Sequence, residues 1–231
     1  MSTATAPWSI SLALLLGWMT PAFVTAQAGD RTAAQVQADL ETRNALVVDF
    51  TADFVQTYEG GMLRSRLVER GSVRIKRPGL MRWDYIDPEP KVYLADGEQF
   101  YSYLELDAQV IVGAMPSLDE AATAMQFLAG AGSIVDDFTA AFDAVDNQPV
   151  NTIALRLDPI RSERDFEFLV VVLDQDTLAI RQLVAHDFGG GVSIYQFANL
   201  QENTGLTDSP FRLDIPAGTN VIAINETSDA R

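Results

Sequence analysis

Apolar residues alternate with polar ones over most of the chain from Leu46 onward, and this alternation limits the fold more than any other feature. In the first such segment the apolar residues are Leu46, Val48, Phe50, Ala52 and Phe54. A period of two is that of a β-strand with one buried face. Because the pattern returns in segment after segment, we expect a mainly β protein.

The same alternation predicts the later strands, and turn residues separate them. Strands are expected at 63–76, 81–85, 92–94, 100–103, 110–112, 152–157, 166–173, 179–188 and 192–200. Asp96-Gly97 predicts a hairpin, because both residues tolerate the positive φ of a type I′ turn. The tail contains Phe211, Leu213, Ile215 and Val221 and is expected to add an edge strand.

Three segments read as helical rather than extended. Thr32 followed by Gln35 is a capping box that predicts a helix over 30–44. A second capping box at 117–120 opens a helix that runs to about Ala129 and stops at Gly130, and 136–142 is expected to form another turn or two. With roughly ten or eleven strands in consecutive order, the predicted architecture is an unclosed antiparallel β-barrel covered by α-helices.

The N-terminus has the pattern of a secretory signal peptide. An apolar run over 10–19 precedes two A-x-A-like sites, which end at Ala26 and Ala28. The run is too short to span a membrane, although no Lys or Arg precedes it, and an uncleaved anchor is the alternative. We expect a signal peptide over 1–26, a single domain over 27–231 and export to the periplasm.

The charge balance excludes several classes of partner. Sixteen Lys and Arg stand against 32 Asp and Glu, and the net charge is -16. Nucleic acid and anionic lipid surfaces both need a basic face, so neither is expected as a partner. The chain has no cysteine, which excludes thiol catalysis, disulfides and cysteine metal sites.

No motif is specific to an enzyme. Gly189-Gly190-Gly191 lacks the helix and the Lys-Ser/Thr of a phosphate loop and reads as a turn. His186 is the one histidine, and no partnered nucleophile can be recognised for it. Acidic pairs such as Asp136 with Asp137, or Asp84 with Asp87, resemble glycosidase carboxylates only in residue type. We expect no enzymatic activity, no cofactor and no metal.

Arg77 is the residue with the most unusual position. It shares the parity of Val73 and Ile75, which marks the buried face of its strand. A guanidinium buried there needs hydrogen-bonding partners. On spacing alone, however, the favoured interpretation is that Pro78 ends the strand and Arg77 has already reached solvent.

Several motifs follow one another in a specific order: Phe50-Thr51-Ala52-Asp53-Phe54-Val55-Gln56, the run from Gly71 through Arg77-Pro78-Gly79 to Arg82-Trp83-Asp84-Tyr85, Asp87-Pro88, and Asp96-Gly97 before Tyr101 and Tyr103. In these motifs the sequence resembles the LolA family of periplasmic outer-membrane lipoprotein carriers. The resemblance implies an unclosed barrel with a helical lid over a hydrophobic cavity. It also implies that Arg77 is the arginine that ties lid to barrel in the empty carrier, which reverses the preference drawn from spacing.

The resemblance further implies partners and a cavity. Family members take acylated lipoproteins from an inner-membrane ABC transporter, LolCDE-like, and pass them to an outer-membrane receptor, LolB-like. We expect a monomer that binds lipid in its cavity. The residues expected to line the cavity, for each of which ordinary core packing is the alternative, are Phe50, Phe54, Val73, Ile75, Met81, Trp83, Tyr101, Leu40, Leu118 and Met125.

Three alternatives stay open at this point. The related outer-membrane receptor needs a lipidated cysteine and a projecting apolar loop, whereas the corresponding link here, 87–90, is short and polar. A periplasmic binding or sensor module can use the same half-barrel for another amphiphile such as a glycolipid. A carboxylate-dependent hydrolase is the third.

Overall fold

A computed structural model describes residues 31–60, 66–114, 127–130, 132–161 and 166–224, and the predicted signal peptide lies outside them. The helices are α1 (Ala33–Leu46), α3 (Ile134–Asp137) and the 3-10 helix η1 (Ser209–Phe211). The strands are β1 (Asp49–Glu59), β2 (Arg66–Lys76), β3 (Leu80–Asp87), β4 (Lys91–Asp96), β5 (Gln99–Leu104), β6 (Gln109–Ala114), β7 (Phe138–Asp143), β8 (Thr152–Pro159), β9 (Phe168–Asp174), β10 (Ile180–His186), β11 (Val192–Glu202) and β12 (Asn220–Ile224).

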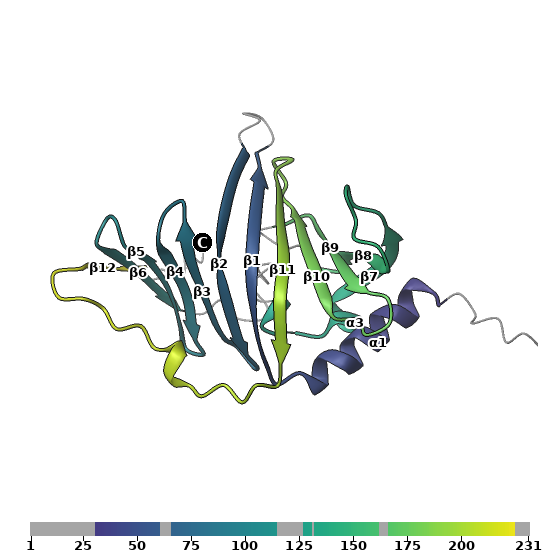
Figure 1. Cartoon of the computed structure of the whole chain (residues 1–231), viewed down its shortest axis with the longest axis horizontal. Coiled ribbons are helices and arrows are strands. Elements are labelled where there is room, and N and C mark those ends of the chain that lie inside the picture. Colours follow the sequence, from purple (N-terminus) through teal and green to yellow (C-terminus); the bar gives the residue numbers. More distant parts are fainter. Residues whose placement is uncertain (1–30, 61–65, 115–126, 131, 162–165, 225–231) are drawn as a thin grey trace, which may run out of the picture. The chain divides into compact units, whose positions relative to one another are not determined.

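The twelve described strands form one sheet in the order β12-β6-β5-β4-β3-β2-β1-β11-β10-β9-β8-β7 (Figure 1). Neighbours pair antiparallel except β12, which lies parallel to β6. The sheet has two edges, β12 and β7, so the prediction of an unclosed, mainly antiparallel barrel is confirmed. The predicted consecutive order holds within two meanders and breaks twice, where β1 pairs with β11 and where β12 pairs with β6. Local patterns do not reveal either of these long-range pairings.

The inner face of the sheet, defined as the face that carries Phe54 and Trp83, holds the main core. Strand register places Phe54 opposite Gly71, and Gly71 opposite Tyr85. A Cβ on Gly71 would lie 2.0 Å from the backbone oxygen of Asp84, so only glycine allows β2 and β3 to pack this closely. The aromatic rings of the core therefore pack above a glycine that leaves room for them.

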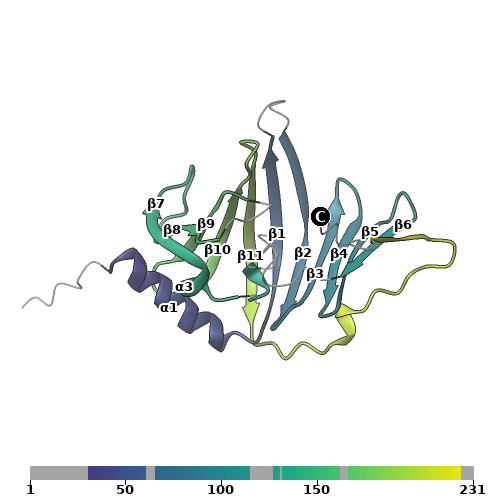
Figure 2. The ribbon, with the colours of Figure 1, turned by 180° about the vertical axis from the view of Figure 1, so that it is seen from behind.

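Helix α1 covers the half of the sheet that contains β7 and β8, and it also contacts α3 (Figure 2). Its capping box forms as predicted: the Gln35 amide donates to Thr32 Oγ1 at 3.2 Å, and the Thr32 amide donates to Gln35 Oε1 at 2.8 Å. Val36 and Leu40 point into the core. None of the helices in the described part of the chain is long and apolar enough to cross a membrane.

Several local predictions were wrong. Leu46 ends α1 and is 72% exposed, and Val48 is 56% exposed, so the alternation predicted from Leu46 begins only at Phe50. The segment 136–142, expected to be helical, contains the end of α3 and then strand β7. The helix predicted over 117–129 lies largely outside the described residues, although residues 127–128 are helical and Gly130 has φ +73°.

A buried carboxylate fixes the chain after β11. Asp49 is 3% exposed, and its oxygens accept hydrogen bonds from the amides of Thr204, Gly205 and Leu206 at 2.7 to 3.1 Å and from the Thr204 hydroxyl at 2.8 Å. Burial alone raises the pKa of this carboxyl, but the hydrogen bonds outweigh burial and lower it from its ordinary 3.8. The charged carboxylate therefore holds residues 204–206 against the start of β1.

Candidate functional site

Arg77 follows the last residue of β2 and lies against the inner face. Its amide donates to the oxygen of Val48 at 2.8 Å, which extends the pairing of β1 and β2 by one residue. Val73 and Ile75 are fully buried on the same face. The side chain of Arg77 is partly buried rather than directed into solvent, so the structure agrees with the orientation that the family resemblance implied.

Among the described residues, the acceptors of the Arg77 guanidinium are all backbone carbonyls, and these come from two segments that cover the sheet. Nη1 donates to the oxygen of Asn44 at 2.6 Å and, more weakly, to that of Val47 at 3.5 Å, both at the C-terminal end of α1. Nη2 donates to the oxygen of Leu128 at 3.2 Å. One side chain of the sheet thus joins α1 to residues 127–130.

Nε of Arg77 is buried, and no acceptor for it exists among the described residues. Gly130 covers this atom: a Cβ at Gly130 would lie 2.8 Å from both Nε and Cδ of Arg77. Because Gly130 has no side chain, residues 127–130 can approach the guanidinium closely. Gly130 therefore covers Nε without accepting a hydrogen bond from it.

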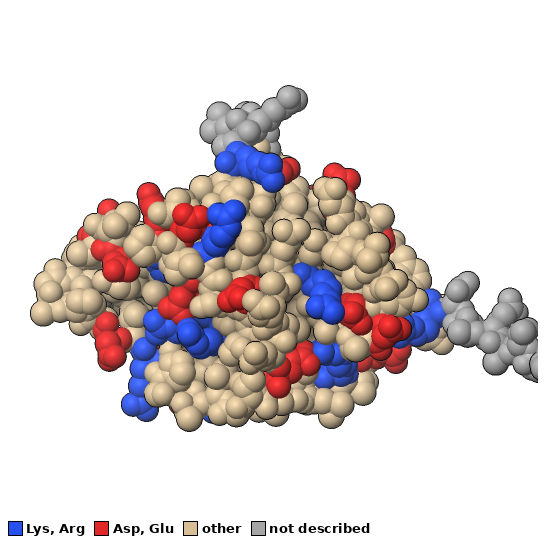
Figure 3. Space-filling model, in the orientation of Figure 1, with Lys and Arg blue, Asp and Glu red and all other residues tan. Residues whose placement is uncertain are grey.

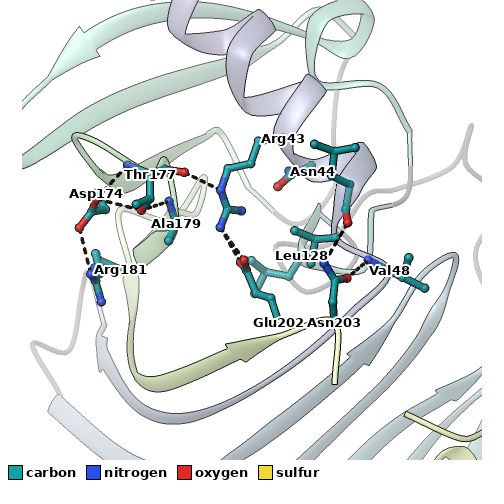
Figure 4. Close-up of polar contacts among 12 residues, drawn as sticks. Arg43, Asn44, Val48, Leu128, Asp174, Thr177, Ala179, Arg181, Glu202 and Asn203 are labelled. Carbon is teal, nitrogen blue, oxygen red and sulfur yellow. Dashed lines mark hydrogen bonds and ion pairs between the residues drawn. The ribbon is translucent and has the colours of Figure 1, made fainter. Parts of the chain in front are cut away.

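No carboxylate forms an ion pair with Arg77 in the described part of the chain. The nearby Glu202 is bound to Arg43 of α1, with its two oxygens 2.6 and 2.8 Å from Arg43 Nη2 (Figure 4). Arg43 Nε donates in addition to the oxygen of Thr177 at 2.6 Å. Burial lowers the pKa of Arg77, and the charge of Arg43 lowers it further, whereas Glu202 acts in the opposite direction.

Two pockets meet at Arg77. The first lies between α1 and the strands β9 to β11, is mostly apolar and is small, with a cavity volume of about 20 Å³; its polar lining residues are Arg43, Asn44, Arg77 and Glu202. The second opens between α1, Gly130 and α3 and is larger, with a volume of about 370 Å³. Arg77 therefore stands at the boundary between a small apolar pocket and a larger, more open cleft.

Helix α1 is bound to the rest of the fold independently of Arg77. Asn203 accepts from the Val48 amide at 2.8 Å and donates to the Leu46 oxygen at 3.1 Å, just after the helix (Figure 4). Gln37 donates to the oxygens of Ile134 and Phe138, both at 2.7 Å. Together with the pair between Arg43 and Glu202, these contacts fix both the middle and the end of α1.

Residues 127–130 are held chiefly by apolar burial, since Phe127, Leu128 and Ala129 are 2 to 6% exposed in the main core cluster. Among the described residues, the bond from Arg77 to Leu128 is the hydrogen bond that joins this segment to another element. The other contacts are apolar, such as the edge-to-face packing of Phe127 on Phe138 with ring centroids 6.1 Å apart. Of the two segments that Arg77 joins, 127–130 thus has fewer other hydrogen bonds among the described residues.

Seven of the residues predicted to line a cavity lie in one buried cluster on the inner face: Leu40, Phe50, Phe54, Val73, Ile75, Met81 and Trp83. Tyr101 lies apart from them. Tyr93 pairs with both Trp83 and Ser102, so the adjacent Tyr101 is on the outer face, where its hydroxyl donates to Asp96. Leu118 and Met125 lie outside the described residues.

Other aromatic residues of the inner face were not among those predicted to line a cavity. Tyr85, Tyr195 and Phe197 belong to the same cluster, and Tyr93 and Phe100 pack against it. Tyr85 has the parity of Met81 and Trp83, and that signal was sufficient to find it. Tyr195 and Phe197 reach the cluster only because β11 pairs with β1, a fact that the sequence does not show.

Comparison with known proteins assigns the family. Residues 46–214 match the family model described as "Outer membrane lipoprotein carrier protein LolA". The chain belongs to this family. The match includes β1 to β11 and Arg77, so most of the inner face described above lies within it.

Relatives named "Outer-membrane lipoprotein carrier protein" support the assignment. The one from Nitrosomonas europaea is 30% identical over 191 residues, which are 82% of this chain and 89% of the relative. The one from Methylococcus capsulatus is 29% identical over 197 residues, 84% of this chain and 89% of the relative. The LolA family is a family of carriers and not of enzymes, in agreement with the expectation from the sequence.

A solved structure has a similar fold. The crystal structure of an uncharacterized conserved protein from Thermus thermophilus superposes with a TM-score of 0.52 at 15% identity, covering 83% of this chain and 99% of that one. At this identity the likeness concerns the fold alone.

Proposed function

We propose that this chain is a periplasmic carrier that binds the acyl chains of lipoproteins released from the inner membrane and delivers them to a receptor on the outer membrane. The observation that supports it most is the position of Arg77. In a member of the LolA family, this side chain ties two covering segments to an apolar sheet face, and its partners in the described part of the chain are neutral carbonyls. Such a contact can break without leaving a buried carboxylate unpaired.

The energetics of acyl chains explain why a carrier is needed. Burial of one methylene contributes about 0.8 kcal/mol, so a chain of about fifteen methylenes favours a membrane over water by about 12 kcal/mol. A lipoprotein therefore does not cross the periplasm unaided. The aromatic and aliphatic cluster of the inner face offers it a comparable environment.

In this proposal Arg77 acts as the latch of the empty carrier. Its bond to Asn44 ties it to α1, and its bond to Leu128 forms only when residues 127–130 also lie against the sheet. Cargo that enters beneath residues 127–130 has to displace the bond to Leu128, so closure competes with binding. This competition keeps the affinity low enough for the cargo to leave.

The partners proposed are those of the family resemblance: a LolCDE-like transporter in the inner membrane and a LolB-like receptor in the outer membrane. Residues 1–26 are proposed to be the signal peptide that brings the chain to the periplasm. The net charge of -16 supports transfer through proteins, since anionic membranes repel an acidic surface. No nucleotide-binding motif is recognisable, so the energy for loading has to come from a partner.

Native mass spectrometry of the chain recovered from the periplasm tests the proposal. The expected result is a fraction of the protein carrying an intact acylated lipoprotein. The same preparation from cells in which lipoprotein acylation is blocked is the control and should carry none. A glycolipid as the bound species, or recovery of the chain with no amphiphile, would contradict the carrier function.

A further inference from the structure

Arg77 has two donor edges, and only one of them is engaged by α1. Nη1 donates to the carbonyls of Asn44 and Val47, whereas Nη2 and Nε face residues 127–130. Helix α1 is held in place by Asn203, Gln37 and Arg43 whether or not Arg77 contributes. When residues 127–130 move away, Arg77 therefore remains bound to α1 and exposes the other edge.

The exposed edge presents two N–H donors, side by side in one plane. Nε already lacks an acceptor in the closed structure, among the described residues, and Nη2 loses the oxygen of Leu128 on opening. The Nε–Nη2 edge of a guanidinium matches a pair of oxygen atoms, as in a carboxylate or an acyl group. When residues 127–130 move away, two N–H donors at the boundary of an apolar pocket are therefore left without acceptors.

Local charge favours the same kind of ligand. Glu202 is already bound by Arg43 through both oxygens, so one positive charge of the trio of Arg43, Glu202 and Arg77 stays uncompensated. The rest of the pocket beside them is apolar, with lining residues that include Leu40, Phe50, Val171, Leu173, Ile180 and Leu200. In the closed structure this pocket is small, about 20 Å³, but Phe127 and Leu128 are among its lining residues, so movement of residues 127–130 enlarges it. The enlarged pocket complements a long apolar chain with oxygen atoms at one end.

We propose that the Nε–Nη2 edge of Arg77 is a binding site for the head of an acyl chain, donating to the oxygens of its carboxylate or acyl carbonyl once residues 127–130 have moved away. The inference rests on the proposed function and deepens it. Arg77 then has two successive roles: it closes the empty carrier through Leu128 and holds the polar end of the ligand in the open one.

Three fluorescent polyene probes test the site, namely a fatty acid, its methyl ester and the corresponding alcohol, titrated at neutral pH into the full mature chain. The wild type should bind the acid about tenfold more tightly than the alcohol, with the ester between them, because charge-assisted hydrogen bonds add to chain burial. Arg77→Leu should bind all three within about twofold of one another, since it keeps the apolar pocket and lacks the donors.

Gly130→Ala separates this role from that of a latch. The new Cβ would meet Arg77 within 2.8 Å, and alanine is strained at φ +73°, so residues 127–130 should be displaced while the guanidinium is retained. This variant should bind all three probes more tightly than the wild type and keep the preference for the acid. If circular dichroism shows that it does not fold, Phe127→Ala takes its place, because it loosens the same segment by removing the ring contact with Phe138.

Arg74→Leu is the matched control, because Arg74 lies on the opposite face of the same strand and pairs with Asp84. It should behave as the wild type does. The inference is overturned if the wild type shows no preference for the acid, if Arg77→Leu retains it, if Arg77→Leu and Gly130→Ala give the same acid-to-alcohol ratio, or if no probe binds to any variant.

These results are independent of those for the proposed function. An Arg77-dependent preference in a chain that carries no lipoprotein in the cell would reject the carrier function and keep the head-group site. Lipoprotein cargo together with no preference would reject the head-group site alone.

Discussion

The two faces of β2 carry the same kind of side chain in opposite environments. On the outer face, Arg70, Arg74 and Lys76 each contact a carboxylate at 2.5 to 2.9 Å. Basic and acidic side chains accordingly lie side by side over β2 and β3 in Figure 3. On the inner face, Arg77 lies at the end of the same strand, binds backbone carbonyls and has no carboxylate partner among the described residues.

The comparison shows that the two faces differ in how much a positive charge costs in stability. Exposed ion pairs contribute about 0 to 1 kcal/mol each, so the outer face tolerates changes of sequence. A partly buried cation without a counter-ion costs more than its neutral hydrogen bonds return. Such a site is useful if Arg77 contributes to opening and closing, as proposed above, and the predictions below probe this contrast.

The inner face should dominate stability. Trp83 is fully buried and packs edge-to-face on Phe54 with centroids 4.9 Å apart. Trp83→Ala should lower the free energy of unfolding by about 3 to 5 kcal/mol, because it leaves a large cavity. Urea unfolding measures the loss, and a loss below about 1 kcal/mol would show that the inner face is loosely packed.

Asp49 is the anionic counterpart of Arg77, since it is buried but fully bonded to N–H and O–H donors. Asp49→Asn should cost about 2 kcal/mol at neutral pH, the scale of charge-assisted hydrogen bonds. The pKa of Asp49 is lowered in the fold, so its contribution is complete above the ordinary pKa of 3.8 and is lost as the pH falls through the folded value.

Unfolding measured as a function of pH checks this sign. The difference between Asp49→Asn and the wild type should shrink as the pH is lowered below about 4. A difference that stays constant over that range would mean that the charge of Asp49 does not stabilise the fold.

The outer face should show the smallest effect. Arg74→Leu removes a half-buried pair with Asp84, which Arg82 still binds, and should change the free energy of unfolding by less than about 1 kcal/mol. Raising the salt concentration should reduce even that difference. A loss comparable with that of Trp83→Ala would remove the distinction between the two faces.

The alternation of apolar residues was sufficient to predict the burial of Met81, Trp83 and Tyr85, because one parity runs through the whole strand. It failed for β5, where aromatic residues occupy positions 100, 101 and 103 and every side chain after Gln99 is half-buried. No parity stands out in such a strand, and Tyr101 was consequently assigned to the inner face.

The turn before β5 also differs from its prediction. Asp96-Gly97 was expected to form a type I′ turn, but the residue of this hairpin with positive φ is Gly97 alone, at +94°. Asp96 ends β4 and accepts hydrogen bonds from the amides of Glu98 and Gln99 instead. The pair Asp96-Gly97 thus predicted the hairpin correctly but placed its two-residue loop one position too early.

The partners of Arg77 could not be read from spacing at all. Asn44 and Leu128 lie 33 and 51 residues away in sequence, and both contribute a backbone oxygen, which any residue type supplies. Strand parity placed the guanidinium on the buried face, whereas Pro78 argued for solvent. Among the observations on the sequence, only the resemblance to the LolA family decided in favour of the buried orientation of Arg77.

Release of cargo by Arg77→Leu tests the central claim most directly. The chain is loaded with a fluorescent acylated lipoprotein, mixed with the outer-membrane receptor, and compared with the wild type and with Arg74→Leu. Loss of closure removes the competitor of cargo, so release should slow about tenfold, the equivalent of about 1.4 kcal/mol, while loading changes by less than about twofold. Release from Arg77→Leu at the rate of the wild type and of Arg74→Leu would contradict the account.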